Sequence, residues 1–417
     1  MRENSLPHFV GLDIGTSVIR CVVGTVNQAD TRPSVIGHGI TPNQGMRKGV
    51  VVHIEDTAEA IAQAVTEAER VSGIQITRAT LNINGAHVSG MNSKGVIAIS
   101  GANREIGDED RLRAEEAATV VKLPPNREIM QVFAKNYSLD GQPNIKDPVG
   151  MHGVRLEVDT HIVSASTPNV RTLHMALDKA QIQPNNIVVS GLAAAEAVLT
   201  RQQKEAGTVL LDIGAGTTNL VVIEDGEVQH VAVLPIGGTH ITNDLAIGLK
   251  TDLDIAEEAK LKHASLTANG SAKKGVVYIE RGSGSEKERF AFRASDIHMI
   301  VEARVEELFE IVNKELIKIH RAKKLPGGVV LVGGTSNLPG IAEFAREQLE
   351  LSARVGKLQP LAGLVDTVDD PGYATSVGLM LLDILMPTQP AANSREHMPV
   401  VGDLNNLFDR LTGFFKK

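Results

Sequence analysis

Two segments of the chain carry aspartate, glycine and hydroxyl side chains in the same order. Asp13 and Asp212 each follow a β-branched run, stand before a glycine-bearing turn, and are succeeded by a second β-branched run. Such a pattern predicts a β-hairpin. Glycines in the turn allow backbone N–H groups to approach a phosphate, and a neighbouring carboxylate can hold the waters around Mg²⁺.

We therefore interpret both turns as phosphate-binding loops of a nucleotide site. Asp13 and Asp212 would hold Mg²⁺ through water. Either turn alone could be an ordinary turn, but two similar turns in the two halves of the chain indicate a duplicated architecture with one hairpin per lobe. The other turn residues would contact the phosphates through their backbones: Gly15, Thr16, Ser17, Gly214, Gly216, Thr217 and Thr218.

A third glycine turn follows the apolar run at 329–332. Gly333, Gly334 and Thr335 stand between this run and an expected helix start. Glycines let the backbone pass close to a flat ligand, and a helix N-terminus favours negative charge. Many strand-to-helix turns have this composition, so the third turn supports a nucleotide site only together with the other two.

The end of the chain, 403–417, carries a separate pattern. Asp403 is a suitable N-cap, and Lys416 and Lys417 can meet anionic head groups. The preceding residues, 388–402, have no period and contain proline, which predicts a flexible linker and favours a helix on a membrane over a helix docked on its own core. The apolar residues recur at helical spacing: Leu404, Leu407, Phe408, Leu411, Phe414 and Phe415.

A single short amphipathic helix is a weak and reversible membrane anchor. Several such tails on one polymer would bind more firmly, because the first attachment raises the effective concentration of the others at the surface. The sequence therefore predicts that membrane binding and self-association of the chain are coupled.

Bulk composition limits the remaining classes of function. The chain has 417 residues, 42% of them hydrophobic and 22% charged, as expected for a globular protein. Its formal net charge of −8 argues against nucleic-acid binding. Cys21 is the sole cysteine, so no internal disulfide is possible, and a reducing cytosol is the expected compartment. We expect neither a signal peptide nor a membrane-spanning helix.

Helix-period patterns alternate with β-branched runs, which predicts α/β layers. Residues 85–163 depart from this alternation and read as a small inserted β/α subdomain. Its strands are expected at 85–100, 129–134 and 155–166, and its helix at 109–121. The expected helices outside the insert span 57–71, 169–180, 192–203, 254–263 and 300–320.

The predicted organisation has two lobes, each interrupted by a smaller unit. Residues 1–84 and 164–200 form the first lobe, and 85–163 is its insert. A linker and a membrane-targeting helix follow the second lobe. The remaining ranges are 201–225 and 296–387 for the second-lobe core, 226–295 for its subdomain, 388–402 for the linker and 403–417 for the helix.

These motifs resemble those of a known superfamily. The hairpins at Asp13 and Asp212 and the loop at Gly333 match, in order and spacing, the phosphate-1, phosphate-2 and adenosine motifs of the actin, sugar-kinase and heat-shock-70 ATPases. The stretches 191–199 and 372–378 stand where the two interdomain helices of that superfamily fall. Over nearly its whole length the chain most resembles the FtsA family of bacterial cell-division proteins. The resemblance implies an actin-like two-lobed ATPase fold with an SHS2-type insert that binds ATP and Mg²⁺.

The resemblance also implies roles for single residues. Glu257 and Lys260 fit the positions of an acidic and a basic residue near the ribose and adenine, although by themselves they could be a solvent-facing ion pair. Hydrolytic relatives carry Glu or Gln at the start of the first interdomain helix to orient water. The stretch 189–193 has neither, and Glu196 lies about two turns further on. We therefore expect ATP binding with weak or no hydrolysis.

A protein of this family would polymerise on the membrane, anchor the tubulin-like division protein FtsZ through its C-terminal peptide, and recruit later division proteins at the mid-cell septum. The resemblance places the FtsZ contact on the second lobe, where Arg293 and Arg304 are candidates, although both could be ordinary surface arginines. The alternatives are a PilM-like pilus-assembly relative, against which the terminal helix argues, and a small-molecule kinase, for which we identify no catalytic acid.

Overall fold

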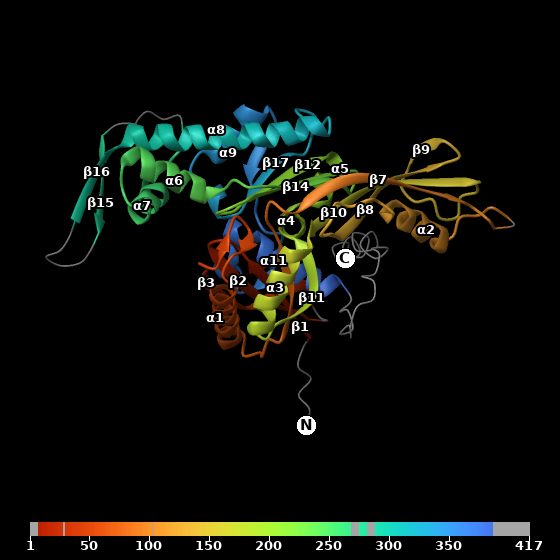
Figure 1. Ribbon diagram of the computed structural model, residues 1–417, viewed down its shortest axis with the longest axis horizontal. Coiled ribbons are helices and arrows are strands. Elements are labelled where there is room, and N and C mark those ends of the chain that lie inside the picture. The colour runs from red at the N-terminus through yellow and green to blue at the C-terminus, as the bar shows by residue number, and fades with distance from the viewer. Residues whose placement is uncertain (1–6, 28–29, 102, 268–274, 282–287, 387–417) are drawn as a thin grey trace, which may run out of the picture.

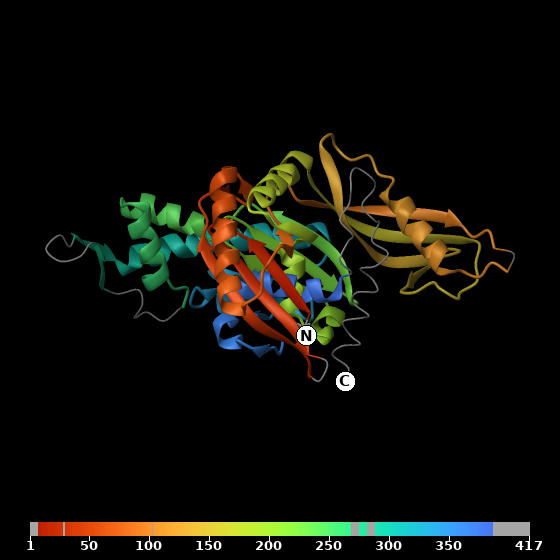
Figure 2. The ribbon, with the colours of Figure 1, turned by 90° about the horizontal axis from the view of Figure 1, so that it is seen from below.

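A computed structural model describes residues 7–27, 30–101, 103–267, 275–281 and 288–386. A six-stranded sheet forms the core of the first lobe, and a nine-stranded sheet runs through the second lobe into the insert. The insert extends from one end of the molecule, and the small subdomain of the second lobe forms the opposite end (Figures 1 and 2).

The first-lobe sheet is covered by helices on both faces, which is why its strands are apolar at successive positions. Helices α1 (Ile54–Ser72) and α3 (Thr167–Lys179) pack on one face, and α11 (Ala374–Leu385) packs on the other. In sheet order the strands are β11 (Gln183–Val189), β6 (Arg78–Ile83), β1 (His8–Ile14), β2 (Val18–Asn27), β3 (Asp30–Pro42) and β19 (Ala362–Gly363).

Two helices cross between the lobes. They are α4 (Ser190–Val198) and α11, in the stretches where the resemblance placed the interdomain helices. A Cβ at Gly378 in α11 would overlap the carbonyl of Ala193 in α4, so the two backbones approach more closely than any other residue would allow.

The second-lobe sheet repeats the plan of the first. Strands β12 and β13 form a hairpin, and β17 pairs parallel to β12 as β6 pairs parallel to β1. The duplicated architecture predicted from the two turns is therefore confirmed. Helices α8 (Ala294–Lys318) and α9 (Ile341–Leu349) pack on this sheet. Its strands are β18 (Ala353–Val355), β17 (Gly328–Val332), β12 (Thr208–Ile213), β13 (Thr218–Glu224) and β14 (Glu227–Leu234).

The second-lobe subdomain consists of helices, a two-stranded ribbon and the first part of α8. Because β14 pairs with β13 along its length, the core sheet extends beyond 225, and we place the start of the subdomain after Leu234. Its other elements are α6 (Gly238–Leu249), α7 (Leu253–His263), β15 (Val276–Arg281) and β16 (Glu288–Arg293).

The predicted helix at 192–203 is wrong as a single element. The chain is extended at Leu199, and a second helix, α5 (Arg201–Ala206), begins two residues later. Thr200 caps α5, since its Oγ1 accepts from Gln203 N at 3.3 Å and its own N–H donates to the Gln203 side chain at 3.0 Å. The other predicted helices outside the insert are confirmed with displaced ends; α8, for example, begins at Ala294.

The insert is a sheet covered by one helix, as predicted. Helix α2 (Asp108–Thr119) packs on β7 and β10, and Gly95 in β7 leaves space for the backbone of Ala114. The insert sheet is not separate, because β7 pairs with β14 and joins the second-lobe sheet. Its strands are β7 (Ser89–Ala98), β10 (Arg155–Ser166), β8 (Arg127–Leu139) and β9 (Gln142–Ile145).

Candidate functional site

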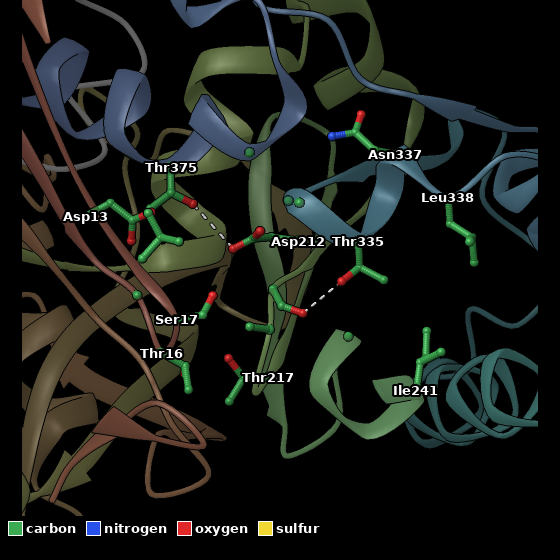
Figure 3. Close-up of a pocket in the computed structure, with 18 of the residues that line it drawn as sticks. Asp13, Thr16, Ser17, Asp212, Thr217, Ile241, Thr335, Asn337, Leu338 and Thr375 are labelled. Carbon is green, nitrogen blue, oxygen red and sulfur yellow. Dashed lines mark hydrogen bonds between the residues drawn. The ribbon is translucent and has the colours of Figure 1, made fainter. Parts of the chain in front are cut away.

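A cavity of about 280 Å³ lies between the two lobes, beside the turns of the paired hairpins (Figure 3). Its walls come from the β1–β2 turn, the β12–β13 turn, the loop after β17, α6, α7 and the start of α11. All but two of the predicted cofactor residues line it: Asp13, Gly15, Thr16, Ser17, Asp212, Gly214, Thr217, Glu257, Lys260, Gly333, Gly334 and Thr335.

Gly216 and Thr218 are the two exceptions. The buried hydroxyl of Thr218 donates to Ile236 O at 2.8 Å, so this side chain fastens β13 to the segment after β14. A Cβ at Gly216 would lie 2.9 Å from Thr16 Oγ1 and 3.1 Å from Lys48 Cα. Gly216 therefore lies at the contact between the lobes and not on the surface of the cavity.

Asp13 and Asp212 are both buried, and each accepts a hydrogen bond from an asparagine amide. Asn82 Nδ2 donates to Asp13 Oδ1 at 2.7 Å, and Asn219 Nδ2 donates to Asp212 Oδ2 at 3.0 Å. Burial raises the pKa of Asp13 to about 7, with Arg20 opposing the rise and Asp212 adding to it. Burial also raises the pKa of Asp212. A raised pKa means that the negative charges of these two carboxylates are poorly compensated by their surroundings. A divalent cation bound beside them would supply the missing positive charge.

Arg20 is a lining residue that the sequence interpretation missed. It is paired with Asp13 in the β1–β2 register, and its guanidinium carbon lies 5.1 Å from the centroid of the Tyr373 ring. The buried Nε of Arg20 has no hydrogen-bond partner among the described residues. A buried guanidinium N–H of this kind fits an anionic ligand such as a phosphate. The signal in the sequence was a charge inside the apolar run of β2.

The third glycine turn packs against the second. Gly333 has φ of +84°, and a Cβ there would lie 2.6 Å from Asp212 Oδ1 and Ile213 O. Thr335 Oγ1 donates to Gly214 O at 3.1 Å (Figure 3). The helix start expected after this turn is a short 3₁₀ helix, η2 (Gly334–Asn337), and α9 begins later.

The start of α11 also reaches the cavity. Thr375 Oγ1 donates to Asp212 Oδ2 at 3.3 Å, which is the other dashed contact in Figure 3. This link joins an interdomain helix to the second-lobe hairpin. Thr375 was not predicted, because no local sequence pattern connects residues so far apart in the chain.

Glu257 and Lys260 form an ion pair at the far end of the cavity, with Nζ and Oε2 2.7 Å apart. Lys260 Nζ also donates to Thr242 Oγ1 at 2.9 Å and Gly238 O at 3.3 Å, so it ties α7 to α6. The side chain of Lys260 is 15% exposed and that of Glu257 is 43% exposed, so one member of the pair is largely covered and the other partly faces solvent. Apolar side chains complete this end: Ile241, Leu261 and Leu338.

The cavity is therefore polar and acidic at one end and partly apolar at the other, as a nucleotide with bound cation requires. At the start of α4 the lining residue is Ser190, whose Oγ accepts from Asn82 Nδ2 at 3.0 Å. Glu196 does not line the cavity. Its carboxylate lies 2.8 Å from Lys204 Nζ in a buried ion pair, which makes it a structural residue.

The candidate partner arginines differ in their surroundings. Arg304 pairs through Nε and Nη2 with Asp244 and through Nη1 with Glu307, within the second lobe. Arg293 is exposed at the end of β16. The predicted membrane-binding residues, 403–417, lie outside the described residues. In the part of the chain that the structure describes, no helix is both long and apolar enough to cross a membrane.

Two lobes that repeat one hairpin motif around a shared cleft, joined by two crossing helices, define an actin-like ATPase fold. Solved structures share it. PilM of the PilM–PilN type IV pilus biogenesis complex aligns with a TM-score of 0.62 and 18% identity, over 90% of this chain and 98% of that chain. MreB5 of Spiroplasma citri bound to ADP aligns with a TM-score of 0.54 and 13% identity, over 90% and 95%. At these identities the similarity shows the fold alone.

Sequence comparison shows the family. The model of the SHS2 domain inserted in FtsA matches residues 85–164, and the model of the cell division protein FtsA matches 209–378. FtsA of Pseudomonas aeruginosa is 36% identical over 372 residues, covering 89% of this chain and 88% of that protein. FtsA of Borreliella burgdorferi is 34% identical over 412 residues, covering 98% of both. The chain belongs to the FtsA family of cell division proteins, as the resemblance predicted.

Proposed function

We propose that this protein binds ATP and Mg²⁺ in the cleft and acts as a membrane-tethered adaptor of the bacterial division machinery. The observation that carries nucleotide binding is the convergence in one cavity of two buried carboxylates, a guanidinium with an unsatisfied N–H, and three glycine turns. Membership of the FtsA family supports the role in division.

Each group in the cleft has a role in this proposal. Bound Mg²⁺ would neutralise phosphate charge. Asp13 and Asp212 would hold its water shell, the turn backbones would donate N–H groups to the phosphates, and Arg20 would donate its free Nε–H. Glu257 and Lys260 would contact the ribose and adenine at the other end.

Calorimetric titration with ATP, with and without Mg²⁺, tests the assignment. Asp212→Asn should abolish the Mg²⁺-dependent part of the affinity, because it removes a charge that the cation needs. Asp225→Asn is the matched control, since Asp225 is exposed in the β13–β14 turn of the same lobe. Equal Mg²⁺ dependence in both variants would contradict the site.

We infer that ATP acts by closing the cleft and favouring polymerisation, with slow hydrolysis. Two observations support slow hydrolysis. Ser190 lines the cavity where hydrolytic relatives carry Glu or Gln, and Glu196 forms an ion pair with Lys204. Single-turnover measurement of phosphate release checks this. A burst of release as fast as ATP binding would contradict it.

For the partner we propose the C-terminal peptide of FtsZ, bound at the outer face of the β15–β16 ribbon. Arg293 pairs across the ribbon with Val276, which is 52% exposed, and Arg289 stacks on the exposed Tyr278 at 3.8 Å. Apolar side chains flanked by exposed arginines fit an acidic peptide with apolar anchors. Arg304 is the weaker candidate, because Asp244 already pairs with it.

Fluorescence anisotropy with a labelled FtsZ C-terminal peptide tests this surface. Arg293→Glu should weaken binding at least about tenfold, since it reverses one charge at the contact. Arg171→Glu, on an exposed position of α3 in the other lobe, is the control. Loss of binding in the control alone would place the contact elsewhere.

We further propose that the apolar face at 403–417 binds the inner membrane, at the division septum, and that later division proteins dock on the insert. Phe408→Glu should release the protein from liposomes and leave ATP affinity unchanged, because Phe408 belongs to the apolar pattern at helical spacing in that segment. Electron microscopy on a lipid monolayer with ATP gives a second test. Filaments that persist after deletion of 403–417, or liposome binding that survives in a polymerisation-defective variant, would contradict the coupled model.

A further inference from the structure

The chain connections of the insert lead to the first lobe, whereas its sheet is joined to that of the second lobe. The chain leaves the first lobe after β6 and returns to it at α3. In between, the sheet of the insert continues the sheet of the second lobe, because Ser89 in β7 pairs with Ala232 in β14. Figure 1 shows β7 running from beside β14 out along the insert.

The junction between β14 and the insert is close-packed. Val231 N in β14 donates to Nε2 of His161 in β10 at 3.0 Å, and the other ring nitrogen lies 2.9 Å from Asn92 Oδ1. His161 is 1% exposed. A Cβ at Gly90 would lie 2.6 Å from Val231 O and would overlap the His161 ring, so only glycine fits there.

A second contact holds the far side of the insert to the same lobe. Lys146 Nζ, just after β9, donates to Asp225 O at 3.0 Å and lies 3.4 Å from Glu205 Oε2. By comparison, the hydrogen bond from Val189 N at the end of β11 to Gln131 Oε1 of the insert is long, at 3.4 Å.

The strands of the insert are fastened to one another at their base. Arg127 Nη2 at the start of β8 donates to Ser164 O in β10 at 2.8 Å and to Ser89 Oγ in β7 at 2.5 Å. The same nitrogen donates to His87 O at 2.9 Å in the connection from the first lobe. These bonds link β7, β8 and β10 at the base of the insert.

Both strands of the junction lead directly to the nucleotide cavity. Asn84, shortly before β7, lines the cavity and donates from Nδ2 to Thr217 Oγ1 in the second-lobe turn at 3.0 Å. Gly238, shortly after β14, lines the cavity as well. Gly85, next to Asn84, has φ of +113°, a conformation that favours glycine.

We propose that nucleotide occupancy of the cleft sets the orientation of the insert relative to the first lobe, through the β7–β14 junction. A ligand that draws the lobes together moves the second-lobe sheet, and the insert follows this sheet because the Ser89–Ala232 pairing, the His161 bond and the Lys146 contacts lie there. The two connections to the first lobe then bend. The inference rests on the proposed nucleotide function, since it needs a ligand that acts on both lobes.

Distance measurement between spin labels tests the proposal on the full chain. Cys21 is buried, so labels are placed on cysteines introduced at exposed positions: Gln63 in α1, Gln142 in β9 and Gln348 in α9. Addition of ATP and Mg²⁺ should shift the distance between positions 63 and 142. The distance between 142 and 348 should stay constant, because the insert and the second lobe move together.

Binding of a fluorescent ATP analogue is measured on the same labelled samples, which separates two kinds of failure. Absence of binding overturns the proposed function, and this inference falls with it. Binding with an unchanged distance between 63 and 142, or with a shift between 142 and 348 instead, overturns the inference and leaves nucleotide binding intact.

Junction variants complete the test. His161→Leu removes the acceptor of Val231 N and should abolish the nucleotide-dependent shift, whereas His161→Gln, which retains an acceptor, should keep it. His152→Leu makes the same change at an exposed position of the insert and should behave as the parent. If His161→Leu does not fold, Lys146→Gln weakens the junction from its exposed side and should reduce the shift. A full shift in the folded junction variants overturns the role of the junction.

Discussion

Gly216→Ala is the most direct test of how the cleft closes. The added Cβ would lie 2.9 Å from Thr16 Oγ1, 3.0 Å from Thr16 Cγ2 and 3.1 Å from Lys48 Cα. Optimal separations between such atoms are about 3.5–4.0 Å, so the two hairpins must separate by several tenths of an ångström. Gly216 does not line the cavity, and the methyl group therefore touches no bound ligand directly.

Overpacking of a close contact costs about 1–3 kcal/mol. We expect the unliganded cleft to relieve this cost by opening, which a ligand bound to both lobes would prevent, so the cost should appear as lost affinity for that ligand. A tenfold change corresponds to about 1.4 kcal/mol, which predicts a loss of about 5-fold to 150-fold in ATP affinity. The free energy of unfolding without ligand should change little.

Titration calorimetry with ATP and Mg²⁺ measures the loss, and urea unfolding without ligand measures stability. Gly107→Ala is the control, because no atom of the described residues lies within 4 Å of a Cβ at that position. Thr16→Ser in the Gly216→Ala background should recover part of the affinity, since it removes Cγ2 and keeps the hydroxyl that accepts from Gly49 N at 3.0 Å. Parental affinity in Gly216→Ala, or a loss of stability without a loss of affinity, would refute the reasoning.

Three further predictions concern buried ionisable groups. Burial lowers the pKa of His161 to about 3, below the value of about 6.5 in an unfolded chain, so the folded state excludes the proton and stability falls as the pH drops below about 6.5. Between pH 7.5 and 5.5 this group should remove about 1.4 kcal/mol from the free energy of unfolding, and urea titrations of His161→Gln should lack that component. Glu196→Ala should lower the free energy of unfolding by about 1.5–3 kcal/mol, because it removes a buried charged hydrogen-bond partner of Lys204. Thermal unfolding checks it, and ATP affinity should match the parent's; a weaker affinity would give Glu196 a part in the site. Arg20→Gln should lower the affinity for ATP by about 10-fold to 100-fold, which corresponds to the loss of one hydrogen bond to a charged group. The affinity for adenosine should stay unchanged. Competition against a fluorescent analogue measures both, and equal losses for ATP and adenosine would contradict a phosphate contact.

The parts of the site that the sequence predicted are those that a short segment specifies by itself. The two hairpins are local: β-branched runs, one glycine-bearing turn each, and an aspartate at a fixed place before the glycine. Such elements depend on interactions between residues that are close in the chain, so the local sequence pattern is enough to predict them. The same holds for the insert helix, whose predicted position differs from α2 by a few residues.

The parts that were missed depend on contacts between distant segments. Thr375 meets Asp212, and Asn82 meets Asp13, only because the lobes and helices are packed as they are. Gly216 stands in a turn whose composition is typical of phosphate binding. Only the structure shows that Gly216 faces Thr16 of the other lobe and so lies at the contact between the lobes. Composition and period do not encode such pairings.

By itself, the sequence determined the duplicated hairpins, the boundaries of the insert to within a few residues, and the resemblance that the FtsA relatives confirm. Only the tertiary structure decided that the insert continues the second-lobe sheet through Ser89 and Ala232. The physical reason is that a strand edge carries unpaired backbone groups that any other edge can satisfy, whatever the side chains. The packing of the two lobes determines that the edge of β7 meets the edge of β14. The same packing places Asn84, shortly before β7, at the wall of the cleft.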